Sequence, residues 1–238
     1  NNLRRIGGTE LDDPPRALGG LDEAPVAVSG NFAFVTGAGT FHVIDISVPS
    51  NSQSVGRHEA CCGMRGKFAI SGNLAILSSG EFVEISDLGR PRVVGSYWPD
   101  GLRASIRSVA ASGNFAYLAV NRPFGEGGTA GSVEVIDFSN LANPQLVAAV
   151  PIDATHGSGV FDISVSGNHA FIAAEGILQI LDLSDPRNPR RLGPISIQDV
   201  AVRGKHAYVA GGQGGLVVLD VSNPANPRWA GGLPTDGF

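Results

Sequence analysis

The sequence predicts an all-β fold, a single β-propeller of five blades with four antiparallel strands each. Three observations lead to this prediction. One strand–turn–strand pattern recurs five times along the 238 residues, glycine is abundant at 33 residues, and charged residues make up only 16% of the chain. This composition is typical of short strands joined by tight turns. Four strands repeated about every 40 residues are typical of a propeller blade.

Each copy of the pattern is anchored by a glycine turn. Apolar alternation on both sides of the glycine predicts two strands. Gly-Asn, or Gly-Lys in the last copy, predicts a tight hairpin between them, because glycine readily adopts positive φ. An alanine three residues after each glycine suggests that neighbouring sheets approach closely there. The anchoring glycines are Gly30, Gly72, Gly113, Gly167 and Gly204.

A third apolar strand follows in each copy and ends on an acidic residue. A serine stands two residues later, and we expect this Asp-x-Ser pattern to cap the turn. A corner rich in proline and asparagine comes next, and it must break the strand because proline has no ladder donor. The short segment after the corner is the predicted outer strand. The acidic residues are Asp45, Glu84, Asp137, Asp182 and Asp220.

The clearest copy reads GLVVLDVSNPANPR from Gly215, and it resembles the LVIVD-repeat family of β-propellers. The resemblance covers about residues 26–232. The second copy departs from it, with Glu84 in place of Asp and no paired proline corner, so its outer strand is the least defined. The resemblance implies a bacterial or archaeal propeller in the extracellular space, at the cell surface or in the periplasm. It implies no particular reaction, because such repeats describe a scaffold.

We interpret residues 1–238 as one propeller domain, with blades at about 26–62, 63–104, 105–152, 153–197 and 198–238. Residues 1–25 are interpreted as a closing or extra outer strand, because Leu11–Leu21 matches the outer-strand pattern a sixth time. We hypothesise that Arg16–Gly20 takes the edge beside the third strand of the fifth copy, so that the segment after Pro227 extends outward. The alternative is that both segments add to that blade. An unpaired edge strand could also promote self-association.

Composition and charge exclude several function classes. The formal charge of −5 and the pI near 5.5 argue against nucleic acid as a partner. No apolar run is long enough for a transmembrane helix. The chain begins with Asn1, as it would after removal of a leader or at a chosen boundary.

The residues just before each innermost strand are predicted to form a ring of mixed charge at the mouth of the propeller axis. Such a ring could hold a polar ligand or an ion. The alternative is architectural, with Asp162 and Asp199 bonding to neighbouring backbone amides. The ring consists of Pro25, Lys67, Ser108, Asp162 and Asp199, with Arg107 and Gln198 beside them. The candidate ligand-binding residues among these are Lys67, Arg107, Asp162, Gln198 and Asp199.

Two insertions, residues 121–132 and 151–161, are predicted to lie on one face of the propeller. Loops that lengthen on one face of a regular scaffold usually carry its specific function. The candidate interaction residues are Arg122, Phe124, Glu126, Asp153 and His156.

Cys61 and Cys62 are the only cysteines, so a disulfide framework is excluded. If oxidised they would form a vicinal disulfide. They could also act as soft metal ligands with His58 and His156, although adjacent ligands strain tetrahedral geometry. Idle or buried thiols are the third alternative. We predict neither a metal site nor a cofactor.

The sequence shows no set of catalytic residues. It contains no G-x-S-x-G nucleophile elbow, no H-E-x-x-H zinc-binding motif and no P-loop. The first hypothesis is therefore a non-catalytic, surface-exposed or secreted interaction module that binds a protein or glycan through the face with both insertions. One alternative is a structural subunit of a homo- or hetero-oligomeric extracellular assembly. Another is an axis-centred hydrolase or lyase that uses Asp162, Asp199, Arg107 and His156.

Overall fold

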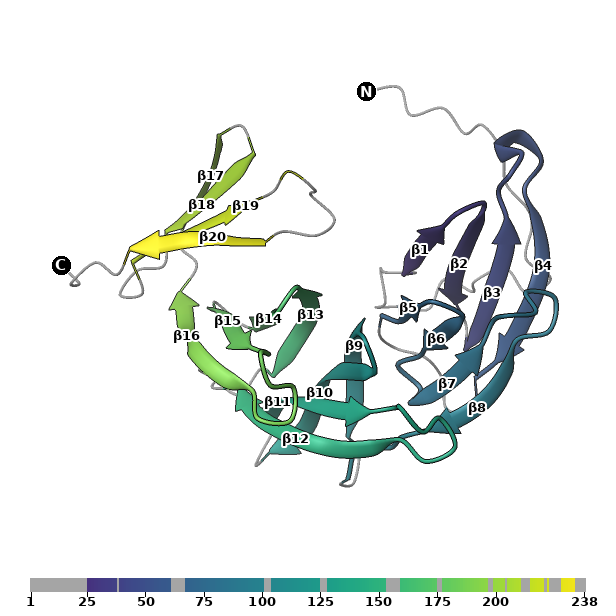
Figure 1. Ribbon diagram of the computed structural model, residues 1–238, viewed down its shortest axis with the longest axis horizontal. Helices are drawn as coiled ribbons and strands as arrows, with labels where there is room; N and C mark the ends of the chain where they lie inside the picture. Colours follow the sequence, from purple (N-terminus) through teal and green to yellow (C-terminus); the bar gives the residue numbers. More distant parts are fainter. Residues whose placement is uncertain are drawn as a thin grey trace. The chain divides into compact units, whose positions relative to one another are not determined.

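The computed structural model consists of five four-stranded antiparallel sheets (Figure 1). It describes residues 25–37, 39–60, 67–100, 104–124, 128–152, 159–174, 177–196, 199–203, 205–210, 215–220, 222 and 228–233. Five such sheets are the blades of a propeller, so the predicted all-β fold and the blade count are confirmed. Within the described residues, no helix has the length and apolar character needed to cross a membrane.

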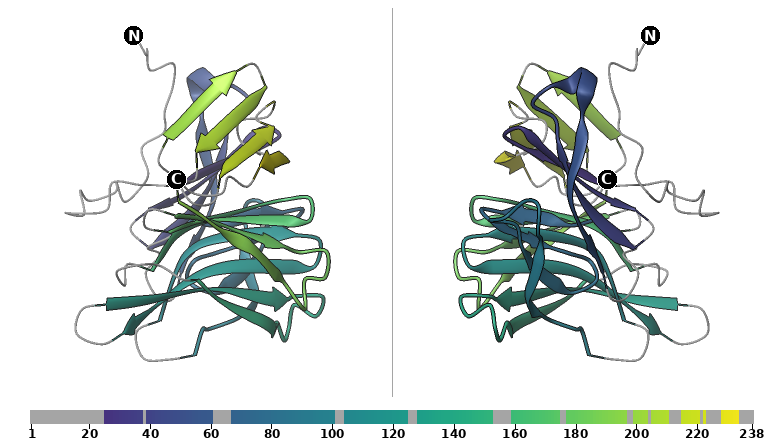
Figure 2. Two further views of the ribbon diagram at one scale, coloured as in Figure 1. Left: turned by 90° about the vertical axis from the view of Figure 1, so that its left-hand side faces the viewer. Right: turned by 90° about the vertical axis from the view of Figure 1, so that its right-hand side faces the viewer.

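The chain forms two compact units, and each is described by itself. The first unit contains residues 1–98 and 140–143, and the second contains residues 99–139 and 144–238. In every sheet the four strands follow one another in chain order. Figure 2 shows the strands of these sheets from two sides.

The first unit holds two sheets. The first sheet contains β1 (Val26–Ser29), β2 (Phe32–Gly37), β3 (Thr40–Asp45) and β4 (Gln53–Glu59), with a short 3₁₀ turn η1 (Pro49–Asn51) at the corner. The second sheet contains β5 (Ala69–Ser71), β6 (Leu74–Ile76), β7 (Glu81–Glu84) and β8 (Arg92–Ser96). The outer strand of the second copy, the least defined in the sequence, is therefore present as β8.

The second unit holds three sheets. The third sheet contains β9 (Ser105–Ser112), β10 (Phe115–Phe124), β11 (Gly128–Asp137) and β12 (Gln145–Ile152). The fourth contains β13 (Val160–Ser166), β14 (His169–Ala174), β15 (Ile177–Asp182) and β16 (Arg190–Ser196). The fifth contains β17 (Asp199–Arg203), β18 (His206–Ala210), β19 (Leu216–Asp220) and β20 (Arg228–Leu233).

Glycine turns join the first two strands of the first four sheets. Gly30, Gly72, Gly113 and Gly167 have φ between 56° and 58°, where a side chain would strain the backbone. Gly204 lies outside the described residues. The predicted hairpins are thus confirmed in these four sheets.

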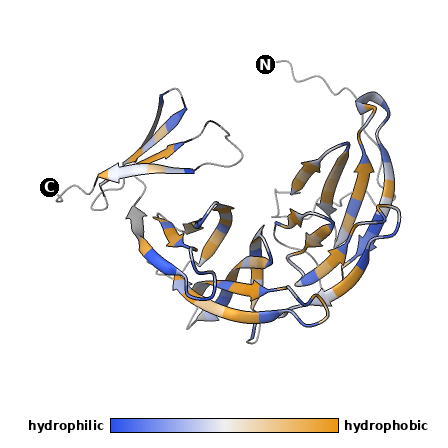
Figure 3. Ribbon diagram, in the orientation of Figure 1, coloured by the Kyte–Doolittle hydropathy of each residue, from blue (hydrophilic) through white to orange (hydrophobic). Residues whose placement is uncertain are grey.

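Each described core lies between the faces of consecutive sheets. In the first unit, Phe41 and Val43 of β3 pack with Ala75 and Val83 of the second sheet. In the second unit, one core joins the third and fourth sheets and another joins the fourth and fifth. Ala75, Ala116 and Ala170 have no exposed surface, as close approach of the sheets requires. Figure 3 shows that the apolar residues are concentrated in the strands.

A β-bulge recurs at one place in all five sheets. The pairing of the third strand with the outer strand shifts register just before the strand ends. In the first sheet, Val43 pairs with Gly56 and Ile44 pairs with Ser54, so Val55 is the extra residue. Such a bulge bends the strand and increases its twist.

The hypothesis that the segment after Pro227 turns outward is wrong. Residues of β20 pair with β19 from Asp220↔Arg228 to Leu216↔Leu233. The physical reason is chain connectivity, since a nearby segment closes a much shorter loop than Arg16–Gly20 would. Residues 1–24 lie outside the described part of the chain.

Candidate functional site

The hairpin of β10 and β11 is longer than the matching hairpins of the other sheets. Both strands have ten residues, whereas β2, β3, β14 and β15 have six. Residues 121–132 were expected to form a loop, and this expectation is wrong for most of them. The ladder continues through Arg122↔Ala130, Pro123↔Thr129 and Phe124↔Gly128. The extension was not predicted because its small and polar residues give only a weak alternation of apolar and polar positions.

Described residues of the two insertions meet at one end of the third and fourth sheets. The Asn121 side chain accepts a hydrogen bond from the Val160 backbone N–H at 2.7 Å and donates one to the Val160 carbonyl at 2.9 Å. Gly131 pairs with Ile152, the last residue of β12. A Cβ atom on Gly131 would lie 2.9 Å from Cγ1 of Val160, so glycine permits the close approach.

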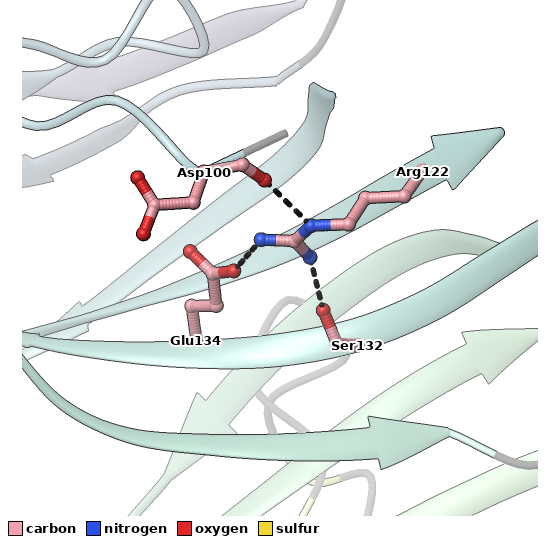
Figure 4. Close-up of polar contacts among 4 residues, drawn as sticks. All are labelled: Asp100, Arg122, Ser132 and Glu134. Carbon is pink, nitrogen blue, oxygen red and sulfur yellow. Dashed lines mark hydrogen bonds and ion pairs between the residues drawn. The ribbon is translucent and has the colours of Figure 1, made fainter. Parts of the chain in front are cut away.

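Arg122, near the tip of this hairpin, donates hydrogen bonds from all three guanidinium nitrogens (Figure 4). Its Nε donates to the Asp100 carbonyl at 2.9 Å, and one terminal nitrogen donates to the Ser132 hydroxyl at 3.0 Å. The other terminal nitrogen forms an ion pair with Glu134, whose side chain is only 2% exposed. The candidate interaction residue Arg122 is therefore a well-anchored strand residue, with 30% of its own side chain exposed.

One face of this end is open to solvent. Phe161 of β13 follows Val160 and is 48% exposed. Pro123 and Ala130 on the hairpin are exposed as well. We call this region the third-sheet end and define it as residues 121–123, 129–131, 160 and 161, of which Pro123, Ala130 and Phe161 are exposed and Gly131 and Val160 are buried.

Among the predicted axis-mouth residues, Asp162 forms hydrogen bonds with residues of two strands. Its carboxylate accepts hydrogen bonds from the Ser108 hydroxyl at 2.6 Å and from the Ile163 N–H at 2.9 Å. Asp162 thus joins β13 to β9, the innermost strands of neighbouring sheets, as the architectural alternative expects. Arg107 is half-buried on β9, and Lys67 precedes β5 in the first unit. Asp199 begins β17, but its side chain is not described.

Several candidate residues lie outside the described residues. These are Gln198, Glu126, Asp153, His156, Cys61, Cys62 and the side chain of Phe124. In the part of the chain that the structure describes, no group of three or more His, Cys, Asp or Glu residues could hold a metal ion.

The Asp-x-Ser pattern caps turns, as predicted. The carboxylates of Asp45, Asp137, Asp182 and Asp220 each accept a hydrogen bond, at 2.8 to 2.9 Å, from the N–H of the serine two residues later. These bonds favour the charged form and lower the pKa of Asp45, Asp137 and Asp220. In the second sheet Glu84 instead pairs with Arg92 across the strands, at 2.5 Å.

The third strand carries a buried position three residues before the acidic residue, polar in four of the five sheets, that was not predicted from the sequence. We call it the third-strand polar position, and its residues are His42, Glu81, Glu134 and Gln179, with Val217 in the fifth sheet. All are at most 6% exposed. Glu81 accepts a hydrogen bond from the Ser79 hydroxyl at 2.8 Å and lies 3.4 Å from Nε2 of His58. A charged residue inside an otherwise apolar strand was the signal that could have revealed the position.

A family model matches the repeats whose resemblance to the LVIVD family is seen in the sequence. Four stretches of the chain, residues 23–59, 105–151, 159–193 and 196–235, match the family model described as LVIVD repeat. The second sheet is not among the matched stretches, in line with its departures from the pattern. No curated protein matches the chain.

Two solved structures illustrate the likeness of fold. A functionally unknown protein from Desulfotomaculum acetoxidans is 13% identical with a TM-score of 0.57, and the match covers 87% of this chain and 67% of that one. A structure described as the COPII outer coat vertex on membranes is 10% identical with a TM-score of 0.51, covering 87% of this chain and 59% of that one. At such low identity the likeness concerns the fold alone. The family follows from the repeats, and the chain belongs to the LVIVD-repeat proteins.

Proposed function

We propose that the protein is a non-catalytic interaction module that binds a protein or glycan through the third-sheet end. The observation that carries this proposal is the exposure of Phe161 beside the elongated hairpin. An aromatic side chain that is 48% exposed on a strand supplies a large apolar contact area. Aromatic residues are enriched where proteins bind one another.

The polar groups at this end support binding better than proton transfer. The carboxylate of Glu134 pairs with Arg122, and that of Asp162 accepts bonds from Ser108 and Ile163. The Asn121 amide bonds the backbone of Val160. These interactions fix the shape of the surface, so a partner would recognise that shape together with the exposed apolar groups.

The same proposal places the module outside the cytoplasm, in the extracellular space, at the cell surface or in the periplasm. This part derives from the family resemblance of the repeats. Fractionation of the source cells with an antibody against the chain tests it. Recovery of the protein with the cytoplasmic fraction alone would contradict it.

A photo-crosslinking amino acid at position 161 tests the binding surface. We expect the full chain with benzoylphenylalanine in place of Phe161 to form a discrete adduct when illuminated in its native cells. The matched control carries the same residue in place of Leu192, which is 52% exposed on β16. A lack of adducts at position 161, or equal adducts at both positions, would refute the proposed surface. Digestion and mass spectrometry identify a captured protein, a glycan or a second copy of the chain.

A further inference from the structure

In the part of the chain that the structure describes, the tip of the β10–β11 hairpin is formed by these two strands alone. β9 pairs with β10 as far as Asn121, and β12 pairs with β11 as far as Gly131. Beyond these residues, no third strand among the described residues pairs with Arg122↔Ala130, Pro123↔Thr129 or Phe124↔Gly128. We call these three pairs the two-stranded ribbon. A ribbon of this kind is at best marginally stable in water without further contacts.

The Arg122 side chain ties the ribbon to the sheet. Its backbone belongs to the ribbon, whereas its guanidinium donates to Ser132 and Glu134 of the four-stranded part and to the carbonyl of Asp100. Charge-assisted bonds from several nitrogens of one guanidinium impose a fixed geometry. The side chain therefore restrains the direction in which the ribbon leaves the sheet.

Glu134 is the buried partner in this contact. A carboxylate that is 2% exposed is stable only if it is paired with a cation or accepts hydrogen bonds. The second sheet repeats the arrangement, since Ser79 and Glu81 occupy the same two positions as Ser132 and Glu134. There the basic partner is His58 of β4. The Ser-x-Glu pattern thus holds a basic side chain in both sheets, and only in the third sheet does that side chain come from a hairpin tip.

We propose that Glu134 is a positioning residue for the third-sheet end: by holding Arg122 it keeps the two-stranded ribbon ordered beside Phe161. This inference rests on the proposed function for its biological meaning. The ordering itself is a property of the free protein and can be measured without a partner.

Residue-resolved hydrogen exchange of the full chain by NMR tests the proposal. We expect Glu134→Val and Arg122→Met to raise the exchange rates of the protected ribbon amides by about tenfold or more, as local opening does. Amides of Tyr117 and Leu118 in the four-stranded part of the sheet should keep their rates. Glu134→Gln, which retains an acceptor of the same shape, should give a smaller increase.

The matched control is Glu81→Val, the same change at the equivalent position of the second sheet. It should leave ribbon exchange unchanged. Unaltered ribbon exchange in Glu134→Val, or an equal rise at Tyr117 and Leu118, would overturn the proposal. If that variant does not fold, Glu134→Gln and Arg122→Met decide the question by the same criteria. Failure of crosslinking at position 161 with faster ribbon exchange would refute the binding surface alone.

Discussion

The contact between His58 and Glu81 offers a quantitative test of how this protein tolerates buried charge. His58 lies at the end of β4 with 15% of its side chain exposed, and Glu81 begins β7 with 7% exposed. Removing one partner of a buried pair typically costs about 3–5 kcal/mol, because the remaining group stays buried without its partner. In His58→Ala the Ser79 hydroxyl still donates to Glu81 at 2.8 Å. We therefore expect a loss near the lower limit, about 3 kcal/mol in the free energy of unfolding.

The double variant His58→Val/Glu81→Val should recover most of that loss. Valine already occupies the third-strand polar position in the fifth sheet, where Val217 is 2% exposed. Replacing a buried pair by well-packed apolar residues is often neutral or stabilising.

Urea unfolding followed by circular dichroism measures these free energies, with His206→Ala on the surface of β18 as the control. The control should stay within about 0.5 kcal/mol of the parent chain. A similarly small effect of His58→Ala, or a double variant less stable than the single one, would refute the reasoning.

Three further predictions concern single side chains. Burial raises the pKa of Tyr117 to about 12, above the value of about 10 in the unfolded chain. Its contribution to stability is therefore complete below about pH 10 and is lost as the pH rises to about 12, because the unfolded chain ionises first. Between pH 9 and pH 12, ionisation of Tyr117 should cost the parent chain about 2–3 kcal/mol in the free energy of unfolding, measured with urea, and Tyr117→Phe should be spared this loss. An equal loss in the parent and the variant would contradict this. The Ser47 backbone bond lowers the pKa of Asp45, so its contribution is complete above about pH 4 and disappears at lower pH. Asp45→Asn should therefore reduce stability at pH 7 but less at pH 2, and an identical reduction at both would count against the capping bond. Asn121→Ala removes both bonds to Val160 and should lower stability by about 1–3 kcal/mol in thermal unfolding, whereas an unchanged Tm would show that the two sheets do not depend on it.

Local chemistry explains which parts of the fold could be predicted. A glycine at positive φ and a proline that ends a strand each determine the nearby backbone, and such residues mark most of the strand ends in the repeat. The Asp-x-Ser caps were predictable for the same reason, because donor and acceptor are two residues apart. Five copies then reinforce one another, so even the irregular second copy could be assigned its four strands.

The candidate site was harder to predict because its contacts join residues far apart in the sequence. Nothing near Asn121 shows that its side chain bonds Val160, 39 residues later. The strand extension through Pro123 was hidden because proline usually disfavours a ladder. Glu134 could have been noticed in its apolar strand, but its partner Arg122 becomes evident only once the two strands are in register.

The recurring bulge has a consequence for how such a chain can grow. Each sheet ends in an edge strand whose backbone groups could pair with another molecule. In all five sheets the bulge interrupts the regular spacing of that strand, so a foreign strand would find no long uniform ladder to extend. The interruption belongs to the repeat itself. A duplicated copy therefore includes the bulge that disfavours edge-to-edge pairing. Gene duplication can lengthen the array without adding an aggregation-prone edge strand each time.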